Sequence, residues 1–140
     1  MAEQQLGGRR VLVVEDEFLL ADDLAQSLEE NGAVVLGPVR TVSAALDLIH
    51  SQPDLDAALL DVNLGREQVF PVAEALEALH VPFCFTTGYE PSSIPERFAG
   101  VARFEKPLNC DAVTRALSES LIHQQREPGA QIQASSSVYG

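Results

Sequence analysis

Short apolar segments recur along the chain and are separated by longer segments with a helical pattern. The apolar segments are mostly rich in β-branched or aromatic residues and do not alternate with polar residues, which is typical of strands buried on both faces of a sheet. We therefore expect five strands, near Val11–Val14, Ala33–Leu36, Ala57–Leu60, Phe83–Phe85 and Val101–Phe104.

The segments between and after these strands carry apolar residues at the spacing of a helix face, with one exception. The first helix is expected to stop at Asn31-Gly32, and the second to begin at a cap formed by Thr41 or Ser43. The exception is Gly88–Gly100, where two prolines leave room only for a short or irregular fourth helix. The apolar stripes of the other four helices are Leu20, Leu24, Ala25 and Leu28; Ala45, Leu46 and Ile49; Val69, Val72, Leu76 and Leu79; and Val113, Ala116, Leu117 and Leu121.

A strand followed by a helix, repeated five times, predicts an α/β domain with a parallel sheet and helices on both faces. We expect this domain to span residues 10–123, after an N-terminal tail at residues 1–9. The end of the chain, residues 124–140, is rich in Gln, Ser and Gly, and we expect it to be a disordered tail.

Composition narrows the class of protein. Hydrophobic residues make up 46% of the 140 residues, enough for one core. The net charge of −12 disfavours direct binding to nucleic acid, which requires basic surface. No apolar run approaches the roughly 20 residues that span a bilayer, and the N-terminus lacks the apolar core of a secretory signal. Cys84 and Cys110 do not suggest a disulfide framework. We therefore expect a soluble, cytoplasmic protein.

Polar groups follow four of the predicted strands. In open α/β sheets, ligands bind just beyond the carboxyl ends of the strands, so these groups are expected to converge at one edge. They are Glu15, Asp16 and Glu17 after the first strand, Asp61 and Asn63 after the third, Thr86 and Thr87 after the fourth, and Lys106 after the fifth.

Such a set has a chemical logic. Clustered carboxylates repel one another, and Mg²⁺, which prefers oxygen ligands, would remove the repulsion. Asp61 could then act as a nucleophile toward phosphorus, while Lys106 and the Thr87 hydroxyl stabilise the phosphoryl oxygens. Each group alone has a plain structural alternative, such as a turn residue, a helix N-terminus or a surface lysine. Four unlike groups after four strands favour a functional site.

The segments that carry these groups resemble the signature segments of response-regulator receiver domains. They are VLVVEDE at 11–17, ALLDVNL at 58–64, FTTGY at 85–89 and EKPL at 105–108. The resemblance covers Arg10 to His123. It implies a flavodoxin-like (βα)5 fold, a doubly wound parallel sheet with strand order 2-1-3-4-5. The segment PFCFTTGY also resembles the FATGUY-type receivers, many of which consist of a single domain.

The resemblance also implies roles for individual residues. Asp61 matches the phosphoacceptor and one of the magnesium ligands. Asp16 matches a direct magnesium ligand, Glu15 one that acts through a water, and the backbone carbonyl of Asn63 the remaining protein ligand. The expected cofactor is therefore Mg²⁺.

Two further positions complete the comparison with the family. Thr87 matches the switch hydroxyl, and Lys106 matches the lysine whose bond to the following proline is typically cis in the family. Most receivers have an aromatic residue three positions before this lysine, where this chain has Arg103, so the usual threonine–aromatic coupling is in doubt. FATGUY-type receivers share this departure.

The resemblance implies a stand-alone response regulator that takes a phosphoryl group from the phosphohistidine of a histidine kinase or a histidine phosphotransfer protein. It would act through protein contacts, as a phosphorelay intermediate or as a phosphate sink, as a monomer or weak dimer, without contacting nucleic acid or membranes. Its only catalysis would be its own phosphorylation and dephosphorylation.

Three other functions compete with this reading. A phosphorylation-independent pseudo-receiver is the main alternative, and Arg103 leaves room for it. A haloacid-dehalogenase-type phosphatase would need a second acid where Asn63 stands, as well as a larger chain. A flavodoxin-like cofactor binder would need a phosphate-cradling loop where the acidic Glu15–Glu17 stands.

Overall fold

The computed structural model describes residues 5–88 and 94–124. Within these residues, five parallel strands form one sheet in the order β2-β1-β3-β6-β7. Counted along the chain, this is the order 2-1-3-4-5 that the resemblance implies, because β4 and β5 form a separate two-stranded ribbon. The sheet strands are β1 (Arg10–Val14), β2 (Val34–Val39), β3 (Ala57–Asp61), β6 (Phe83–Thr87) and β7 (Arg103–Glu105).

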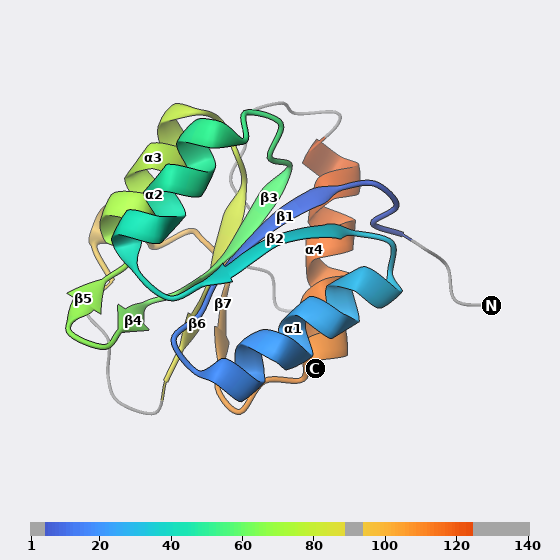
Figure 1. Ribbon diagram of the computed structural model, residues 1–140, viewed down its shortest axis with the longest axis horizontal. Coiled ribbons are helices and arrows are strands. Elements are labelled where there is room, and N and C mark those ends of the chain that lie inside the picture. The colour runs from blue at the N-terminus through green and yellow to red at the C-terminus, as the bar shows by residue number, and fades with distance from the viewer. Residues whose placement is uncertain (1–4, 89–93, 125–140) are drawn as a thin grey trace.

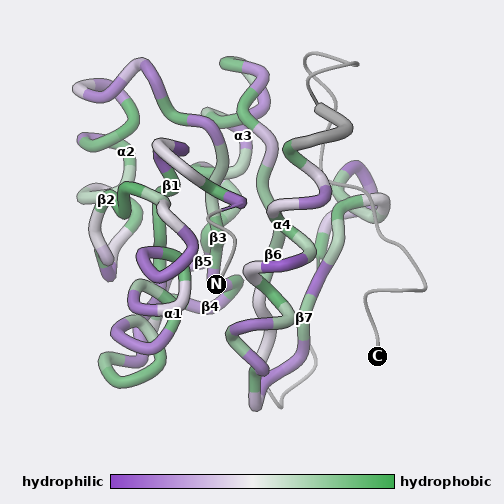
Figure 2. Tube along the Cα trace, turned by 90° about the vertical axis from the view of Figure 1, so that its right-hand side faces the viewer, coloured by the Kyte–Doolittle hydropathy of each residue, from purple (hydrophilic) through white to green (hydrophobic). Residues whose placement is uncertain are grey.

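Helices cover both faces of this sheet (Figure 1). Helix α1 (Phe18–Glu30) packs beside α4 (Cys110–Gln124) on one face, and α2 (Val42–Ser51) packs beside α3 (Phe70–Ala78) on the other. Figure 2 shows hydrophobic and hydrophilic residues alternating along α1, as expected of a helix with one face on a core. None of the helices in the described residues is long and apolar enough to cross a membrane. The predicted doubly wound α/β fold is confirmed.

The core consists of two clusters, one on each face of the sheet. Leu12 and Val14 of β1 belong to the cluster beneath α2 and α3, whereas Val11 and Val13 belong to the cluster beneath α1 and α4. The four side chains are at most 1% exposed. Successive residues of a strand point to opposite faces, so a strand between two helical layers must be apolar at every position. This explains the continuous apolar runs of the sequence.

Several boundaries differ from those predicted. The last strand begins at Arg103 rather than Val101, because the N–H of Val101 closes a turn with the Phe98 carbonyl. The second strand continues past Leu36 to Val39, although Gly37 would ordinarily end it. The ribbon of β4 (Asn63–Leu64) and β5 (Glu67–Gln68) was not predicted, since two-residue strands leave no periodic pattern. The cap of the second helix is Thr41, whose side chain accepts a hydrogen bond from the N–H of Ala44.

The N-terminal segment adds to the packing of the domain. Leu6, which we assigned to an N-terminal tail, is fully buried in the cluster beneath α1 and α4. Its backbone N–H donates to the carbonyl of Asn31 over 2.9 Å. Residues 5–9 therefore pack against the end of α1. The expected C-terminal tail lies outside the described residues, apart from the last residue of α4.

The described part of the segment after β6 carries only a short helical turn, in agreement with the predicted short or irregular fourth helix. Between β6 and β7, the described residues contain only the 3-10 turn η1 (Glu96–Phe98), and the rest of the expected irregular segment, residues 89–93, lies outside them. The ring of Phe98 is fully buried and stacks on Phe70 of α3 with the ring centroids 6.0 Å apart. It also meets Phe85 of β6 edge to face. This ring fixes η1 against the sheet and α3.

Gly37→Ala is expected to lower the free energy of unfolding by about 2 kcal/mol, because a side chain does not fit at this irregularity of β2. Gly37 has φ +92°, and a Cβ there would lie 2.7 Å from the Val39 nitrogen and 2.9 Å from the Val13 oxygen. Gly100→Ala is the control, since its Cβ would meet nothing within 4 Å. Urea denaturation measures both variants, and equal effects would contradict the explanation.

Candidate functional site

The carboxyl ends of four neighbouring strands bring the predicted site residues to one edge of the sheet. Glu15 directly follows β1, Asp61 ends β3, Thr87 ends β6, and Lys106 directly follows β7. The side chains of Glu15 and Asp61 are only 1% and 3% exposed, and that of Lys106 only 7%. Glu15, Asp61 and Lys106, three of the groups predicted to converge, are therefore in contact, and they are buried.

Lys106 is the centre of this cluster. Its Nζ donates to Glu15 Oε2 over 2.9 Å, to Asp61 Oδ2 over 3.2 Å and to Glu17 Oε2 over 2.7 Å. Glu17 is the residue that the sequence reasoning missed, since it appeared among the acids after the first strand but was given no role. Its position next to the acidic pair was the only available signal. One ammonium thus bridges two carboxylates from the segment after β1 and one from the last residue of β3.

Burial and mutual repulsion shift the protonation of the cluster. The pKa of Glu15 is raised to about 7, mainly by desolvation and further by the hydrogen bond and charge of Asp61. The hydrogen bonds from the Glu17 N–H and from Lys106 lower this pKa, but they do not outweigh the other causes. Burial would lower the pKa of Lys106. The hydrogen bonds to Glu17 and Glu15 and the charge of Asp61 outweigh burial and raise that pKa above its usual value. Lys106 is therefore a cation at neutral pH, and Glu15 is poised between its two forms.

Hydrogen bonds from the surrounding backbone and hydroxyl groups fix this arrangement. The backbone N–H of Asn63 donates to Asp61 Oδ1 over 3.2 Å, and the buried Thr86 hydroxyl donates to Glu15 Oε1 over 3.5 Å. The N–H of Lys106 donates to the carbonyl of Thr87 over 2.8 Å, which ties the two predicted switch residues together through the backbone. The bond from Lys106 to Pro107 is cis, as the resemblance implies.

Asp16 lies apart from the other two predicted carboxylates. Its Oδ1 is 3.7 Å from Arg40 Nη2, and its side chain is 40% exposed. Within residues 5–88 and 94–124, no three His, Cys, Asp or Glu side chains are grouped closely enough to hold a metal ion. Of the three predicted carboxylate ligands, Glu15 and Asp61 both contact Lys106. The third, Asp16, faces Arg40 instead.

The chemistry of the donors nevertheless fits a hard divalent cation. Glu15 and Asp61 offer only oxygen atoms, which are the ligands that Mg²⁺ prefers. With Glu17 they set three carboxylates against a single ammonium, so the edge has more negative than positive charge. A cation would offset this surplus, and the exposed Asp16 could join it by leaving a surface ion pair that holds it weakly.

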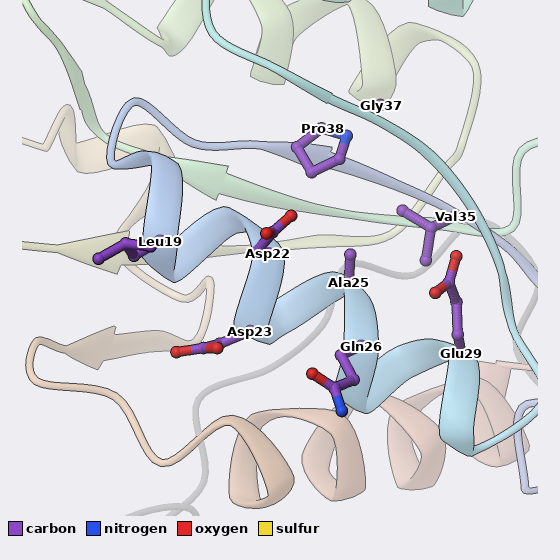
Figure 3. A pocket seen from close by; sticks show the side chains of 9 residues that line it. All are labelled: Leu19, Asp22, Asp23, Ala25, Gln26, Glu29, Val35, Gly37 and Pro38. Atoms are coloured by element: carbon purple, nitrogen blue, oxygen red, sulfur yellow. The ribbon is translucent and has the colours of Figure 1, made fainter.

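A surface pocket of about 460 Å³ lies elsewhere, between α1 and β2 (Figure 3). Carboxylates of Asp22, Asp23 and Glu29 line it together with apolar side chains such as Val35 and Pro38. None of the predicted site residues lines this pocket. The candidate chemistry therefore belongs to the carboxyl edge of the sheet and not to this pocket.

Comparison with known proteins points to one family, although no family model matches the chain. The solution structure of SdrG from Sphingomonas melonis Fr1 is 41% identical, with a TM-score of 0.71 over 82% of this chain and 97% of SdrG. A response regulator receiver protein from Sinorhizobium medicae WSM419 shares the fold, with a TM-score of 0.70 over 84% of this chain and 97% of that one, at 20% identity.

A curated relative agrees with these structures. The phyllosphere-induced regulator PhyR of Methylorubrum extorquens is 32% identical over an alignment of 123 residues that covers 82% of this chain and 44% of PhyR. The chain thus spans less than half of that protein. The SdrG match extends over nearly its whole length, and the sheet order is the one that the resemblance implies. The chain therefore belongs to the response-regulator receiver family.

Proposed function

We propose that this protein is a stand-alone response regulator that accepts a phosphoryl group on Asp61, from a phosphohistidine, in a magnesium-dependent reaction. The observation that carries the proposal is the buried Asp61 carboxylate, bonded to Lys106 and adjacent to Glu15 at the carboxyl edge of the sheet. The match over 97% of SdrG supports a receiver that works as a single domain. A histidine kinase or a histidine phosphotransfer protein would be the donor.

The residues of the cluster have separate tasks in this reaction. A carboxylate oxygen of Asp61 forms a bond to phosphorus while the bond from phosphorus to the donor imidazole breaks, and the imidazole nitrogen keeps the electron pair. The Lys106 ammonium and the Thr87 hydroxyl bind phosphoryl oxygens. Glu15, Asp16, Asp61 and the Asn63 carbonyl would hold a magnesium ion, which would supply positive charge. Hydrolysis of the acyl phosphate restores the carboxylate.

Intact mass spectrometry after incubation with acetyl phosphate tests the proposal. We expect the wild-type chain to gain one phosphoryl group in the presence of Mg²⁺ and none when EDTA is added. Asp61→Asn should gain none, while Asp47→Asn, which changes an exposed carboxylate on α2, should behave as wild type. Because some receivers ignore small donors, a negative result is repeated with phosphorylated kinases. Failure with every donor would favour the phosphorylation-independent pseudo-receiver.

A protein donor would meet apolar surface beside the site. Phe18 and Leu19, which follow Glu17 at the start of α1, are 69% and 75% exposed. Large exposed apolar side chains often anchor protein interfaces. We therefore propose that this end of α1 contacts the phosphodonor protein.

The double variant Phe18→Ser and Leu19→Ser is tested with a kinase that phosphorylates the wild type. We expect phosphotransfer from this kinase to slow by about tenfold, as for the loss of an interface anchor. The rate with acetyl phosphate should stay within about twofold, because the reacting groups are unchanged. Leu79→Ser, at the end of α3, is the control, since Leu79 is also exposed. Equal slowing with both donors would show damage to the site rather than to docking.

A further inference from the structure

We propose that Glu17 is a positioning residue, which holds the Lys106 ammonium against Glu15 and Asp61 until a phosphoryl group takes its place. The inference rests on the proposed function and deepens it. Among the three bonds of Nζ, the one to Glu17 Oε2 is the shortest, at 2.7 Å, against 2.9 Å to Glu15 and 3.2 Å to Asp61. The residue that binds the lysine most closely is thus one without a role in the proposed reaction.

The exposure of the partners shows which bond can be exchanged. Glu15 and Asp61 are buried and cannot leave Lys106 without stranding a charge. The side chain of Glu17 is 61% exposed, so water can solvate its carboxylate when the bond breaks. The Glu17 contact is therefore the one that Lys106 can give up most easily.

The backbone holds Glu17 at the place where this exchange occurs. Its N–H donates to Glu15 Oε2 over 3.0 Å, and Glu15 Oε2 also accepts from Lys106 Nζ. Glu17 is also the residue that directly precedes the first turn of α1. Its carboxylate therefore reaches Lys106 from the solvent side, while Glu15 and Asp61 hold the ammonium from the buried side.

Competition for one ammonium has a direct chemical consequence. A phosphoryl group on Asp61 needs Lys106 for its oxygens, and a carboxylate that already occupies a hydrogen of Nζ opposes this contact. Removing the Glu17 contact should therefore favour binding of a phosphoryl group. Because Glu17 is largely solvated, we expect an effect of about two- to fivefold.

Two substitutions separate the contact from the charge. Glu17→Asp keeps the charge but shortens the side chain by one methylene, so the carboxylate loses its reach to Nζ. Glu17→Gln keeps the length but replaces the ion pair with a weaker bond from the ammonium to a neutral amide oxygen. Asp22→Asn is the matched control, because it removes an exposed negative charge from α1, the helix that Glu17 directly precedes, without touching Lys106.

The first measurement needs neither metal nor donor. Lys106 is the only lysine in the chain, so a sample labelled with ¹⁵N-lysine gives a single Nζ signal by NMR. We expect Glu17→Asp and Glu17→Gln to shift this signal and to speed exchange of its ammonium protons with water, and Asp22→Asn to leave both unchanged. If both Glu17 variants match the wild type, Glu17 does not hold the lysine and the inference is wrong.

The second measurement is the affinity for beryllium trifluoride with Mg²⁺, together with the rate of adduct formation from acetyl phosphate. We expect the affinity and the rate of both Glu17 variants to exceed those of the wild type by about two- to fivefold. Equal increases of affinity and rate in Glu17→Gln and Asp22→Asn, with no increase in Glu17→Asp, would mean that general charge repulsion explains the effect. Competition for Lys106 would then not explain it. If the wild type accepts no phosphoryl group from any donor, the proposed function fails, whereas the NMR result still decides whether Glu17 holds Lys106.

Discussion

Replacing Lys106 with methionine is expected to lower the free energy of unfolding by about 3–5 kcal/mol at pH 8 without divalent cations. The ammonium is the shared partner of Glu15 and Asp61, whose side chains are 1% and 3% exposed. Methionine fills most of the volume of the lysine but brings no charge, so two neighbouring carboxylates would remain buried without a cation. Urea denaturation at pH 8 in EDTA measures the loss.

The loss should shrink as the pH falls. Without Lys106, the pKa of Glu15 should rise further above about 7, because the lysine is one of the groups that lower it. The folded variant then binds a proton that the unfolded chain has released, so its stability falls as the pH rises and recovers toward pH 5. Added Mg²⁺ should restore part of the loss at pH 8, since it supplies the missing positive charge.

Arg97→Met provides a matched control for this prediction. Arg97 is also a cation near two carboxylates, since its Nη2 is 3.1 Å from Glu74 and 3.7 Å from Glu77. Its side chain is 52% exposed, however, so its removal should cost less than about 1 kcal/mol. Equal losses in the two variants would mean that burial of the carboxylates does not set the cost.

The pattern of apolar positions was sufficient to predict a parallel sheet and the edge at which Glu15, Asp61 and Lys106 meet. Residues 57–60 of β3 lie between two helical layers, so the core requires an apolar residue at each of these positions, and this requirement is visible in the sequence. Once the strands are parallel, their carboxyl ends meet at one edge. Asp61 and Lys106 are 45 residues apart in the chain, yet their convergence follows from topology alone.

Contacts that depend on side-chain rotamers could not be predicted in the same way. Asp16 and Glu17 are neighbours of the same type, but one reaches Arg40 and the other Lys106. Only the directions of the side chains after β1 separate them, and no periodic pattern encodes these directions. Likewise, the burial of Leu6 depends on a single apolar residue in a polar segment, which is too short to give a period.

Glu15→Gln is expected to remove most of the pH dependence of stability between about pH 4.5 and pH 7. The pKa of Glu15 is about 7 in the folded chain against an ordinary value of 4.5, mainly because of burial, so between these values the folded chain binds more protons than the unfolded one. The free energy of unfolding therefore falls as the pH rises through this range, by about 3 kcal/mol at most from Glu15 alone. Glutamine does not ionise and cannot contribute this fall.

Urea denaturation of both proteins in EDTA at pH 4.5 and pH 8 checks this difference. Glu119→Gln is the control, because Glu119 is an exposed carboxylate on α4 and its replacement should leave the pH dependence unchanged. If Glu15→Gln and the wild type lose the same free energy between the two pH values, Glu15 is not the group that carries the pH dependence of stability.

The same variant links the stability of the site to its proposed metal. At pH 8 the wild type has ionised Glu15 beside Asp61, and a divalent cation that binds there relieves their repulsion in the folded chain only. Mg²⁺ should therefore raise the unfolding midpoint of the wild type more than that of Glu15→Gln. At pH 5, where Glu15 is protonated in the folded chain, the two proteins should respond to Mg²⁺ almost equally, because the repulsion that the cation relieves has already been removed by the proton.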